Sequence, residues 1–221
     1  MKRFSGLLVF IINFIATALI IGFSPATNVP THYNVNGVAD AYSSKWTFLW
    51  LQILPLIFSV VIIVLSYLSQ RGIIKNKNIK YFNRVLFSLE VFFIVFLWFA
   101  MMPALNMAKT MSSNLNTFIL ISLGALLAIW SNIFPKLKPN SFIGIRTAST
   151  LKNEKIWRKT HRLAGYLGVI SGVLMIVFAV VTFFLSLSTV LSIIIGVSIF
   201  IVIGLLIPTF YAYSLSKKSI D

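Results

Sequence analysis

Long apolar runs alternate with short polar loops along almost the whole chain. Six runs stand out, and each approaches the roughly 20 residues that an α-helix needs to cross the hydrocarbon core of a bilayer. The last two belong to one uncharged stretch, 163–216, which would be about 80 Å long as a single helix, so a turn is predicted near 186–189. The predicted spans are Leu7–Phe23, Thr47–Tyr67, Val85–Leu105, Thr117–Phe134, Leu163–Leu187 and Thr189–Tyr213.

The basic residues collect in alternate loops. Of the nineteen Lys and Arg residues, all but Lys45 and Lys109 lie before the first span, between spans two and three, between spans four and five, or after span six. Because cytoplasmic loops carry the excess of Lys and Arg, this pattern places both termini inside the cell. The sequence therefore predicts an all-α integral membrane protein with six transmembrane helices, cytoplasmic N and C termini and a short hairpin-like loop outside.

The first apolar run has a second interpretation. Lys2 and Arg3 precede it and the small-x-small triplet Ser24-Pro25-Ala26 follows it, as in a cleaved signal peptide. Running from 7 to 23, it is longer than the usual apolar core of about 7–15 residues, which favours a retained helix. On this basis the chain divides into a two-span unit with the outside loop (1–68), spans three and four (69–138), and a polar inner loop with spans five and six (139–221).

Composition also indicates a membrane protein. Apolar residues make up 58% and charged residues 10% of the chain, with a mean hydropathy of +0.94, whereas soluble domains average about 25% charged residues. The net charge of +15 could indicate nucleic-acid binding. Its placement in short loops is explained by topology instead, so no direct nucleic-acid partner is expected. Loop 71–84 would face the anionic inner leaflet. The attraction of each basic residue to that surface is worth about 1 kcal/mol.

No catalytic group of residues is evident. The two histidines, His32 and His161, fall on opposite sides of the predicted membrane and cannot share a metal ion. The chain has no cysteine, no H-E-x-x-H pair and no glycine-rich phosphate loop. We therefore expect neither enzyme activity nor a cofactor or metal.

The first outside loop, 24–46, is predicted to form a β-hairpin. Asn36-Gly37 is a strong hairpin signal, because a type I′ turn needs positive φ at both central residues. Pairing around this turn would set Tyr33 opposite Asp40. The loop is either a recognition surface or a capped loop with interfacial aromatic anchors. Its recognition candidates are Pro30, His32, Asn34, Gly37, Asp40 and Lys45.

Glu90 is the one acidic residue inside a predicted span. An ionisable group at that depth is expensive to bury as a charge, so it needs a physical reason. Three remain open: a structural ion pair with a basic residue, a proton or substrate role, or a neutral, protonated side chain. The basic residues nearest in predicted depth are Arg84, Arg146 and Arg162.

Small residues recur at four-residue steps in the last two spans, a spacing that lets helices approach closely in lipid. We expect these two spans to pack on each other as a tight hairpin. Prolines inside spans are expected to mark kinks or breaks. The small residues are Ala164, Gly168, Gly172, Ser188, Ser192 and Gly196, and the prolines are Pro55, Pro103 and Pro208.

The inner stretch 139–162 is the most polar part of the chain. Asn153 is suited to cap a helix that is basic on one side and aromatic on the other, which predicts a short interfacial helix continuing into span five. Gly144 is free to bring Arg146 close to other backbone, and Arg146 is the basic residue that the helical pattern explains least. The basic side holds Lys155, Arg158, Lys159 and Arg162, and the side facing the acyl boundary holds Trp157, Thr160, His161 and Ala164.

The polar residues of this stretch resemble a known signature. The pattern Asn140-x-Phe142-x-Gly144-x-Arg146-Thr147-x-x-Thr150-Leu151-x-Asn153-x-x-x-Trp157-x-x-x-His161 is similar to that of the SdpI family of bacterial membrane proteins. The outside loop, Pro30-x-His32-x-Asn34-x-x-Gly37-x-x-Asp40-x-x-x-x-Lys45, resembles the N-terminal domain of unknown function found in many members. One departure is that Ala148-Ser149 stands where members often have Pro-Trp.

The resemblance implies a function. The family is named for an immunity protein against a secreted cannibalism toxin. It thus implies a multi-span protein of the bacterial cell membrane that protects its producer, with a peptide toxin as its partner outside. The founding member also holds a transcriptional repressor at the membrane, so a receptor with a cytosolic regulator as partner is an alternative. A small transporter, suggested by Glu90 and the in-span prolines, is a second alternative.

Overall fold

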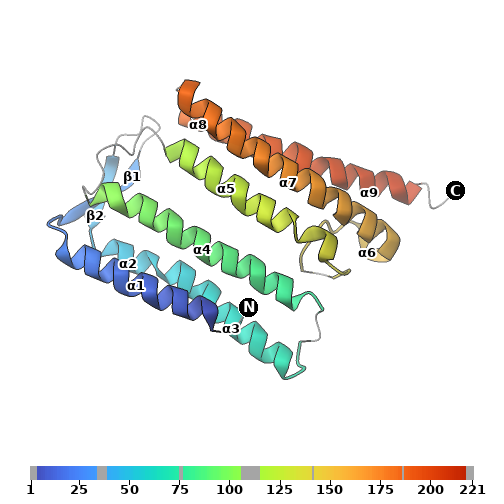
Figure 1. Cartoon of the computed structure of the whole chain (residues 1–221), viewed down its shortest axis with the longest axis horizontal. Coiled ribbons are helices and arrows are strands. Elements are labelled where there is room, and N and C mark those ends of the chain that lie inside the picture. The colour runs from blue at the N-terminus through green and yellow to red at the C-terminus, as the bar shows by residue number, and fades with distance from the viewer. Residues whose placement is uncertain are drawn as a thin grey trace. The chain divides into compact units, whose positions relative to one another are not determined.

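The computed structural model of the chain describes residues 4–33, 39–74, 77–105, 115–140, 142–185 and 187–217. They include six helices that are long and apolar enough to cross a membrane, which confirms the prediction of an all-α, multi-pass protein (Figure 1). The chain forms two compact units, Met1–Lys75 with Asn83–Asn114, and Asn76–Phe82 with Leu115–Asp221. The first holds the outside loop and the second holds the signature stretch.

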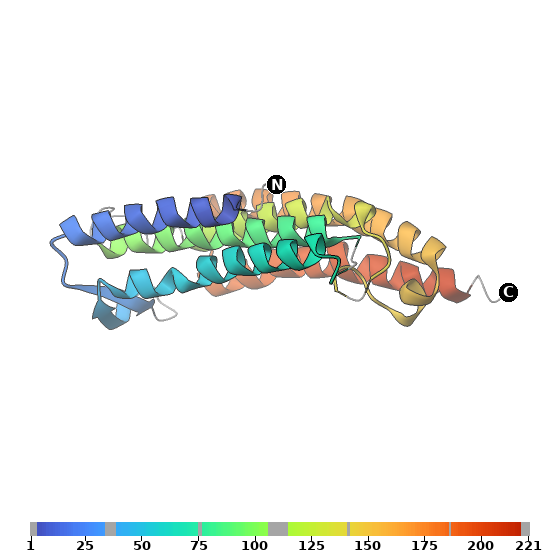
Figure 2. The ribbon, with the colours of Figure 1, turned by 90° about the horizontal axis from the view of Figure 1, so that it is seen from below.

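Three long helices of the first unit run side by side (Figure 2). They are α1 (Ser5–Phe23), α3 (Ile53–Gln70) and most of α4 (Ile79–Ala104). The short helix α2 (Thr47–Leu51) precedes α3, and the two are separated at Gln52. Pro55 lacks the N–H that would bond the Leu51 carbonyl, so the break predicted near this proline has a direct cause.

The outside loop forms the predicted hairpin. Strand β1 (Asn28–Tyr33) pairs antiparallel with β2 (Ala39–Ser44). Tyr33 lies opposite Ala39, so the predicted pairing of Tyr33 with Asp40 is wrong. The cause is an irregular register on either side of His32, as in a β-bulge. The Asn36-Gly37 turn and the candidates Asn34 and Gly37 lie outside the described residues.

The hairpin is fastened to the helices at its base. Val29 of β1 is fully buried in an apolar cluster with Ile21 of α1, Phe48 of α2 and Met101 of α4. Burying an aliphatic side chain of this size is worth about 1.5–3 kcal/mol. The base of the hairpin is therefore packed against the ends of three helices.

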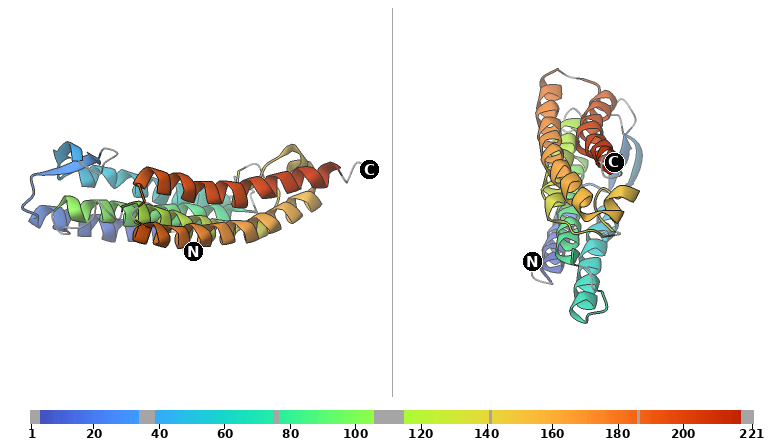
Figure 3. Two further views of the ribbon diagram at one scale, coloured as in Figure 1. Left: turned by 90° about the horizontal axis from the view of Figure 1, so that it is seen from above. Right: turned by 90° about the vertical axis from the view of Figure 1, so that its right-hand side faces the viewer.

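The second unit is built on one long helix, α7 (Glu154–Leu185), with the last span beside it (Figure 3). That span begins at Thr189, and the Ser188 side chain accepts a hydrogen bond from the Leu191 N–H at 3.3 Å. The turn predicted near 186–189 is thereby confirmed. The other elements are α5 (Leu115–Ser131), η1 (Phe134–Lys136), α6 (Ala148–Lys152), α8 (Thr189–Ile199), η2 (Phe200–Leu206) and α9 (Ile207–Lys217).

The small residues of α7 pack on α5, which the sequence did not predict. A Cβ on Gly172 would lie 2.6 Å from the Gly124 carbonyl oxygen and 2.9 Å from the Ala128 Cβ. A Cβ on Gly168 would collide with the Ser131 side chain. The last span does contact α7 as expected, but the four-residue spacing serves the α5–α7 crossing, because backbones approach most closely there.

The last span contains a π-helical segment, η2, which ends two residues before Pro208. Proline has no N–H, so one carbonyl in the preceding turn loses its helical partner. The Thr209 hydroxyl donates to the Leu205 carbonyl at 2.7 Å and satisfies another acceptor of the same turn. Pro208 thus marks an irregular turn, in line with the prediction.

Candidate functional site

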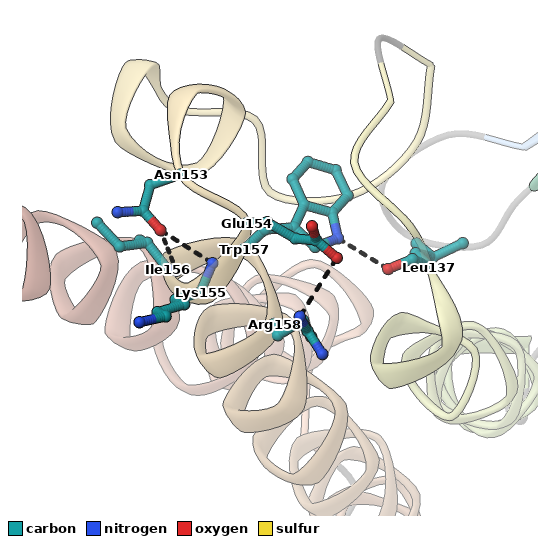
Figure 4. A network of polar contacts seen from close by, with 7 residues as sticks. All are labelled: Leu137, Asn153, Glu154, Lys155, Ile156, Trp157 and Arg158. Carbon is teal, nitrogen blue, oxygen red and sulfur yellow. Dashed lines mark hydrogen bonds and ion pairs between the residues drawn. The ribbon is translucent and has the colours of Figure 1, made fainter.

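The signature stretch is organised by the first turns of α7. Asn153 caps the helix, with its Oδ1 accepting from the N–H groups of Lys155 (2.9 Å) and Ile156 (3.3 Å) (Figure 4). Glu154 and Arg158 form an exposed ion pair at 3.4 Å. The predicted division of this helix into two sides is confirmed, because Lys155, Arg158, Lys159 and Arg162 are exposed while Ile156, Trp157, Thr160, His161 and Ala164 are buried.

The basic turns continue into span five without a break, as predicted. The helix is uninterrupted over its 32 residues, which makes it about 48 Å long, against a hydrocarbon core of about 30 Å. Its basic end therefore continues in line with the span through the headgroup layer. A basic segment lying flat in the interface would have to be separated from the span by a break, and α7 is continuous.

Trp157 faces the protein, so its predicted place at the acyl boundary is wrong. The side chain is fully buried, and its Nε1 donates to the Leu137 carbonyl at 2.8 Å (Figure 4). The hydrogen bond explains the difference, because an indole N–H needs an acceptor that hydrocarbon cannot supply. The pattern located the buried side correctly but did not show what covers it.

His161 joins α7 to the signature loop through both ring nitrogens. Its Nδ1 lies 2.9 Å from the Trp157 carbonyl oxygen, which can only accept, so Nδ1 carries the hydrogen. Its Nε2 accepts from the Ile145 N–H at 3.0 Å. The ring also stacks on Trp157, with centroids 3.9 Å apart. This is a neutral histidine whose tautomer is fixed by two backbone partners.

Gly144 is the residue that lets the loop reach this ring pair. Its φ is +117°, a backbone conformation that residues other than glycine rarely adopt. A Cβ here would collide with the His161 Nε2 and lie 3.3 Å from the Trp157 ring. The prediction that Gly144 permits a close approach holds, but the residues approached are His161 and Trp157, and Arg146 is not involved.

Asparagine side chains hold the loop on both flanks. The Asn140 Oδ1 accepts from the N–H groups of Phe142 (2.8 Å) and Ile143 (2.9 Å). Asn78 makes a two-point contact with Lys138, donating to its carbonyl at 2.8 Å and accepting from its N–H at 2.9 Å. Sequence reasoning missed Asn78, because nothing in its own neighbourhood points to a partner so far along the chain.

Thr147 and Thr150 form a capping box at the start of α6. The Thr147 Oγ1 accepts from the Thr150 N–H at 3.2 Å, and the Thr150 Oγ1 accepts from the Thr147 N–H at 2.9 Å. The buried Thr150 hydroxyl also donates to the Ile145 carbonyl at 2.9 Å. These two signature residues therefore fix the backbone on either side of Arg146.

Two signature residues remain free of this framework. Phe142 is 70% exposed, and Arg146 is exposed without a hydrogen bond or ion pair to any residue that the structure describes. Asn140, Gly144, Thr147, Thr150, Trp157 and His161 hold the loop in place, and Leu151 is partly exposed on α6. The framework thus presents one aromatic and one guanidinium group at its surface.

On the outside hairpin, His32 and Asp40 form an exposed pair. The His32 Nδ1 lies 2.5 Å from the Asp40 Oδ1, and the side chains are 67% and 43% exposed. Lys45 has a structural task, because its Nζ donates to the Ser24 carbonyl at 2.7 Å and so closes the end of α1. Pro30 lies in the strand pair opposite Tyr42. His32 and Asp40 are therefore the described candidates that remain available to a partner.

Glu90 is fully buried in the first unit. Its Oε1 accepts from the Ser59 hydroxyl at 2.7 Å, and its Oε2 has no hydrogen-bond partner among the described residues. The Glu90 carboxyl forms no ion pair with any residue that the structure describes. The ion pair considered from the sequence is thus replaced by a hydroxyl contact.

A second buried polar contact in this unit was not predicted. The Asn13 Nδ2 donates to the Gln52 Oε1, and the Trp98 Nε1 donates to the Asn13 Oδ1, each at 2.6 Å. The contact joins α1, the α2–α3 break and α4. A lone amide in an apolar span was the available signal, since such a group needs a partner in lipid.

Comparison with known proteins supports the same reading of both motifs. Residues 136–212, which contain the whole inner signature, match the model of the SdpI/YfhL protein family. This part of the chain is similar to that family. Residues 8–58, which include the outside hairpin, match a domain of unknown function, DUF1648. The resemblances seen in the sequence are thereby confirmed, and this family is not an enzyme family.

One relative matches the chain over nearly its whole length. The Immunity protein SdpI of Bacillus subtilis (strain 168) is 24% identical over 217 residues, covering 98% of this chain and 97% of the relative. No solved structure matches the chain.

Proposed function

We propose that the chain is an immunity protein of the bacterial cell membrane that protects its producer from a membrane-active peptide toxin. The observation that carries the proposal is the match, over 98% of the chain, to a relative named Immunity protein SdpI. A match of this extent includes the outside hairpin and the inner signature together. One chain thus carries both the outside hairpin, proposed to meet the toxin, and the inner signature.

The outside hairpin supports interception of a peptide before it enters the bilayer. In the predicted topology this face is outside, and its base is anchored by buried Val29. Around it lie exposed aromatic side chains, which give an amphipathic peptide apolar surface near the membrane boundary. These are Phe23 (88% exposed), Tyr42 (63%), Trp46 (46%) and Trp50 (71%).

Complementation tests the proposal. Bacillus subtilis strain 168 lacking its own Immunity protein SdpI would express this chain and grow in its own toxin-containing medium, and we expect survival to be restored. A second arm challenges a sensitive bacterium with a panel of purified membrane-active peptides. No gain in survival in either arm would contradict the proposed function.

We expect His32→Ala and Asp40→Ala each to weaken protection. The toxin concentration that the cells survive should fall by about tenfold in each variant. Loss of one well-placed contact at a binding surface costs about 1–2 kcal/mol, and 1.4 kcal/mol is a factor of ten. The measurement is the minimal inhibitory concentration at matched amounts of protein in the membrane. Thr31→Ala, an exposed change on the same strand, is the control, and equal sensitivity of all three variants would move recognition away from the hairpin.

A second function as a receptor is favoured by the exposed pair Phe142 and Arg146. A cytosolic regulator would dock on them from the inner side, while the basic turns of α7 bind anionic lipid. In cells carrying a fluorescent regulator encoded next to the gene, Phe142→Ala with Arg146→Ala should leave survival unchanged and abolish recruitment to the membrane. Lys152→Ala, exposed but outside the signature, should recruit normally, and equal recruitment by both proteins would rule out this role.

A further inference from the structure

The Glu90 carboxyl lies where three helices of the first unit meet. Ser59 on α3 donates to its Oε1, and its Oε2 faces Gly6 on α1, where a Cβ would lie only 2.6 Å away. The side chain is 0% exposed, and no residue that the structure describes donates a hydrogen bond to Oε2. A buried acceptor without a partner is costly, so this oxygen favours a ligand small enough to fit against a backbone.

Both charge states of this carboxyl can be accommodated. In the ionised state, Ser59 donates to Oε1, and Oε2 lies beside the first turn of α1, the positive end of that helix dipole. In the neutral state, the added proton sits on Oε2 and removes the charge from an apolar surrounding. The Ser59 bond to Oε1 persists in both states, because the remaining carbonyl oxygen still accepts from the hydroxyl.

Among the described residues, the other charges on the surrounding helices are distant, and Lys2 and Arg3, which precede α1 in the sequence, lie outside the described residues. Helix α1 contains no titratable residue, and the one on α3 is Tyr67, about 12 Å from Ser59 along the axis. On α4 the nearest is Arg84, about 9 Å away along the axis, with Tyr81 and Lys80 further on. A proton fits the space between Oε2 and Gly6, which cannot hold a Cβ. It also supplies the positive charge that the described residues of these helices do not place in contact with Oε2.

We propose that Glu90 is an intramembrane proton-binding site that exchanges with the cytoplasmic side. The carboxylate takes one proton from hydronium, leaving water, and returns it by the reverse step. Gly6 lies in the first turn of α1, at its cytoplasmic end in the predicted topology, so the proton would enter from that side. Binding of the proton changes how α1 packs against α3 and α4. The first unit therefore responds to the proton concentration of the cytoplasm.

The chain allows this carboxyl to be observed alone. Its only two glutamates are Glu90 and Glu154, and Glu154 is exposed on α7. In Glu154→Gln protein made with glutamate carrying carbon-13 at the carboxyl carbon, Glu90 gives the single labelled signal. Solid-state NMR of this protein in bilayers, over roughly pH 5 to 9, reports its charge state directly.

We expect the Glu90 signal to pass between the ionised and the neutral state within that range. Ser59→Ala should move the midpoint by about one pH unit, since a hydrogen bond to a charged group is worth about 1.5–3 kcal/mol. Ser66→Ala, on the same helix and bonded to Asn83 instead, should leave the midpoint in place. A signal that keeps one charge state throughout, or equal midpoints in both serine variants, would overturn the proposal, whatever the outcome of the immunity tests.

Discussion

Alanine at Gly144 is expected to lower the free energy of unfolding by about 3 kcal/mol and to release the signature loop. Backbone strain at a glycine-only φ contributes about 1–3 kcal/mol, and overpacking contributes about as much again. The new methyl would collide with the His161 ring nitrogen that accepts the Ile145 N–H. Thermal unfolding of purified protein, with trypsin cleavage after Arg146 as a local probe, measures both effects.

Gly72 supplies a matched control. It also has a positive φ (+73°), but a Cβ there would meet nothing within 4 Å. Gly72→Ala should therefore show only the strain, about 1 kcal/mol. Equal losses in the two variants would mean that the contact of Gly144 with His161 and Trp157 contributes nothing.

Valine at Gly172 is the second change for which we expect a large effect, a loss of about 3 kcal/mol. The side chain would press on the Gly124 carbonyl and the Ala128 Cβ. A backbone atom cannot move aside as a side chain can, so α5 and α7 must separate, and the close packing that holds helices together in lipid is lost. The melting temperature in detergent or lipid measures this loss.

The control for the helix crossing is Gly22→Ala in α1, where a Cβ would meet nothing within 4 Å. Glycine inside a helix is about 1 kcal/mol less favourable than alanine, so this variant should be slightly more stable. A Gly172→Val protein that melts at the wild-type temperature would show that α5 and α7 are not in close contact.

The spans, the last turn and the outside hairpin could be predicted because each depends on local pattern. Apolar length gave the helices, and the polar break near Ser188 gave the turn. The hairpin register could not be predicted, because the irregularities beside His32 depend on two features of the folded strand. These are the burial of Val29 against the helices and the missing N–H of Pro30.

The contacts that make the sites could not be predicted, because they join residues far apart in the sequence. Periodicity showed that Trp157 lies on the buried side of its helix, but the acceptor at Leu137 depends on the fold of the loop. Asn78 with Lys138 and Ser59 with Glu90 are of the same kind. A single polar residue in a span indicates that a partner exists without saying which one.

The signature can now be divided by task. Asn140, Gly144, Thr147, Thr150, Trp157 and His161 build a rigid inner loop, and Phe142 and Arg146 are what it presents. In the predicted topology this loop and the hairpin face opposite sides of the membrane. The proposed immunity function therefore predicts that changes on the hairpin alter protection directly, and that changes at Phe142 and Arg146 alter only what happens inside the cell.

The central claim is that this chain protects a bacterial membrane from a peptide toxin. Its most direct test is the membrane potential of toxin-sensitive cells, followed with a potential-sensitive dye as toxin is added. Cells expressing the chain should keep their potential at a toxin concentration that depolarises cells with an empty vector, and cells expressing Gly144→Ala or Gly172→Val at matched amounts should retain it less well. Equal depolarisation with and without the chain would contradict the claim.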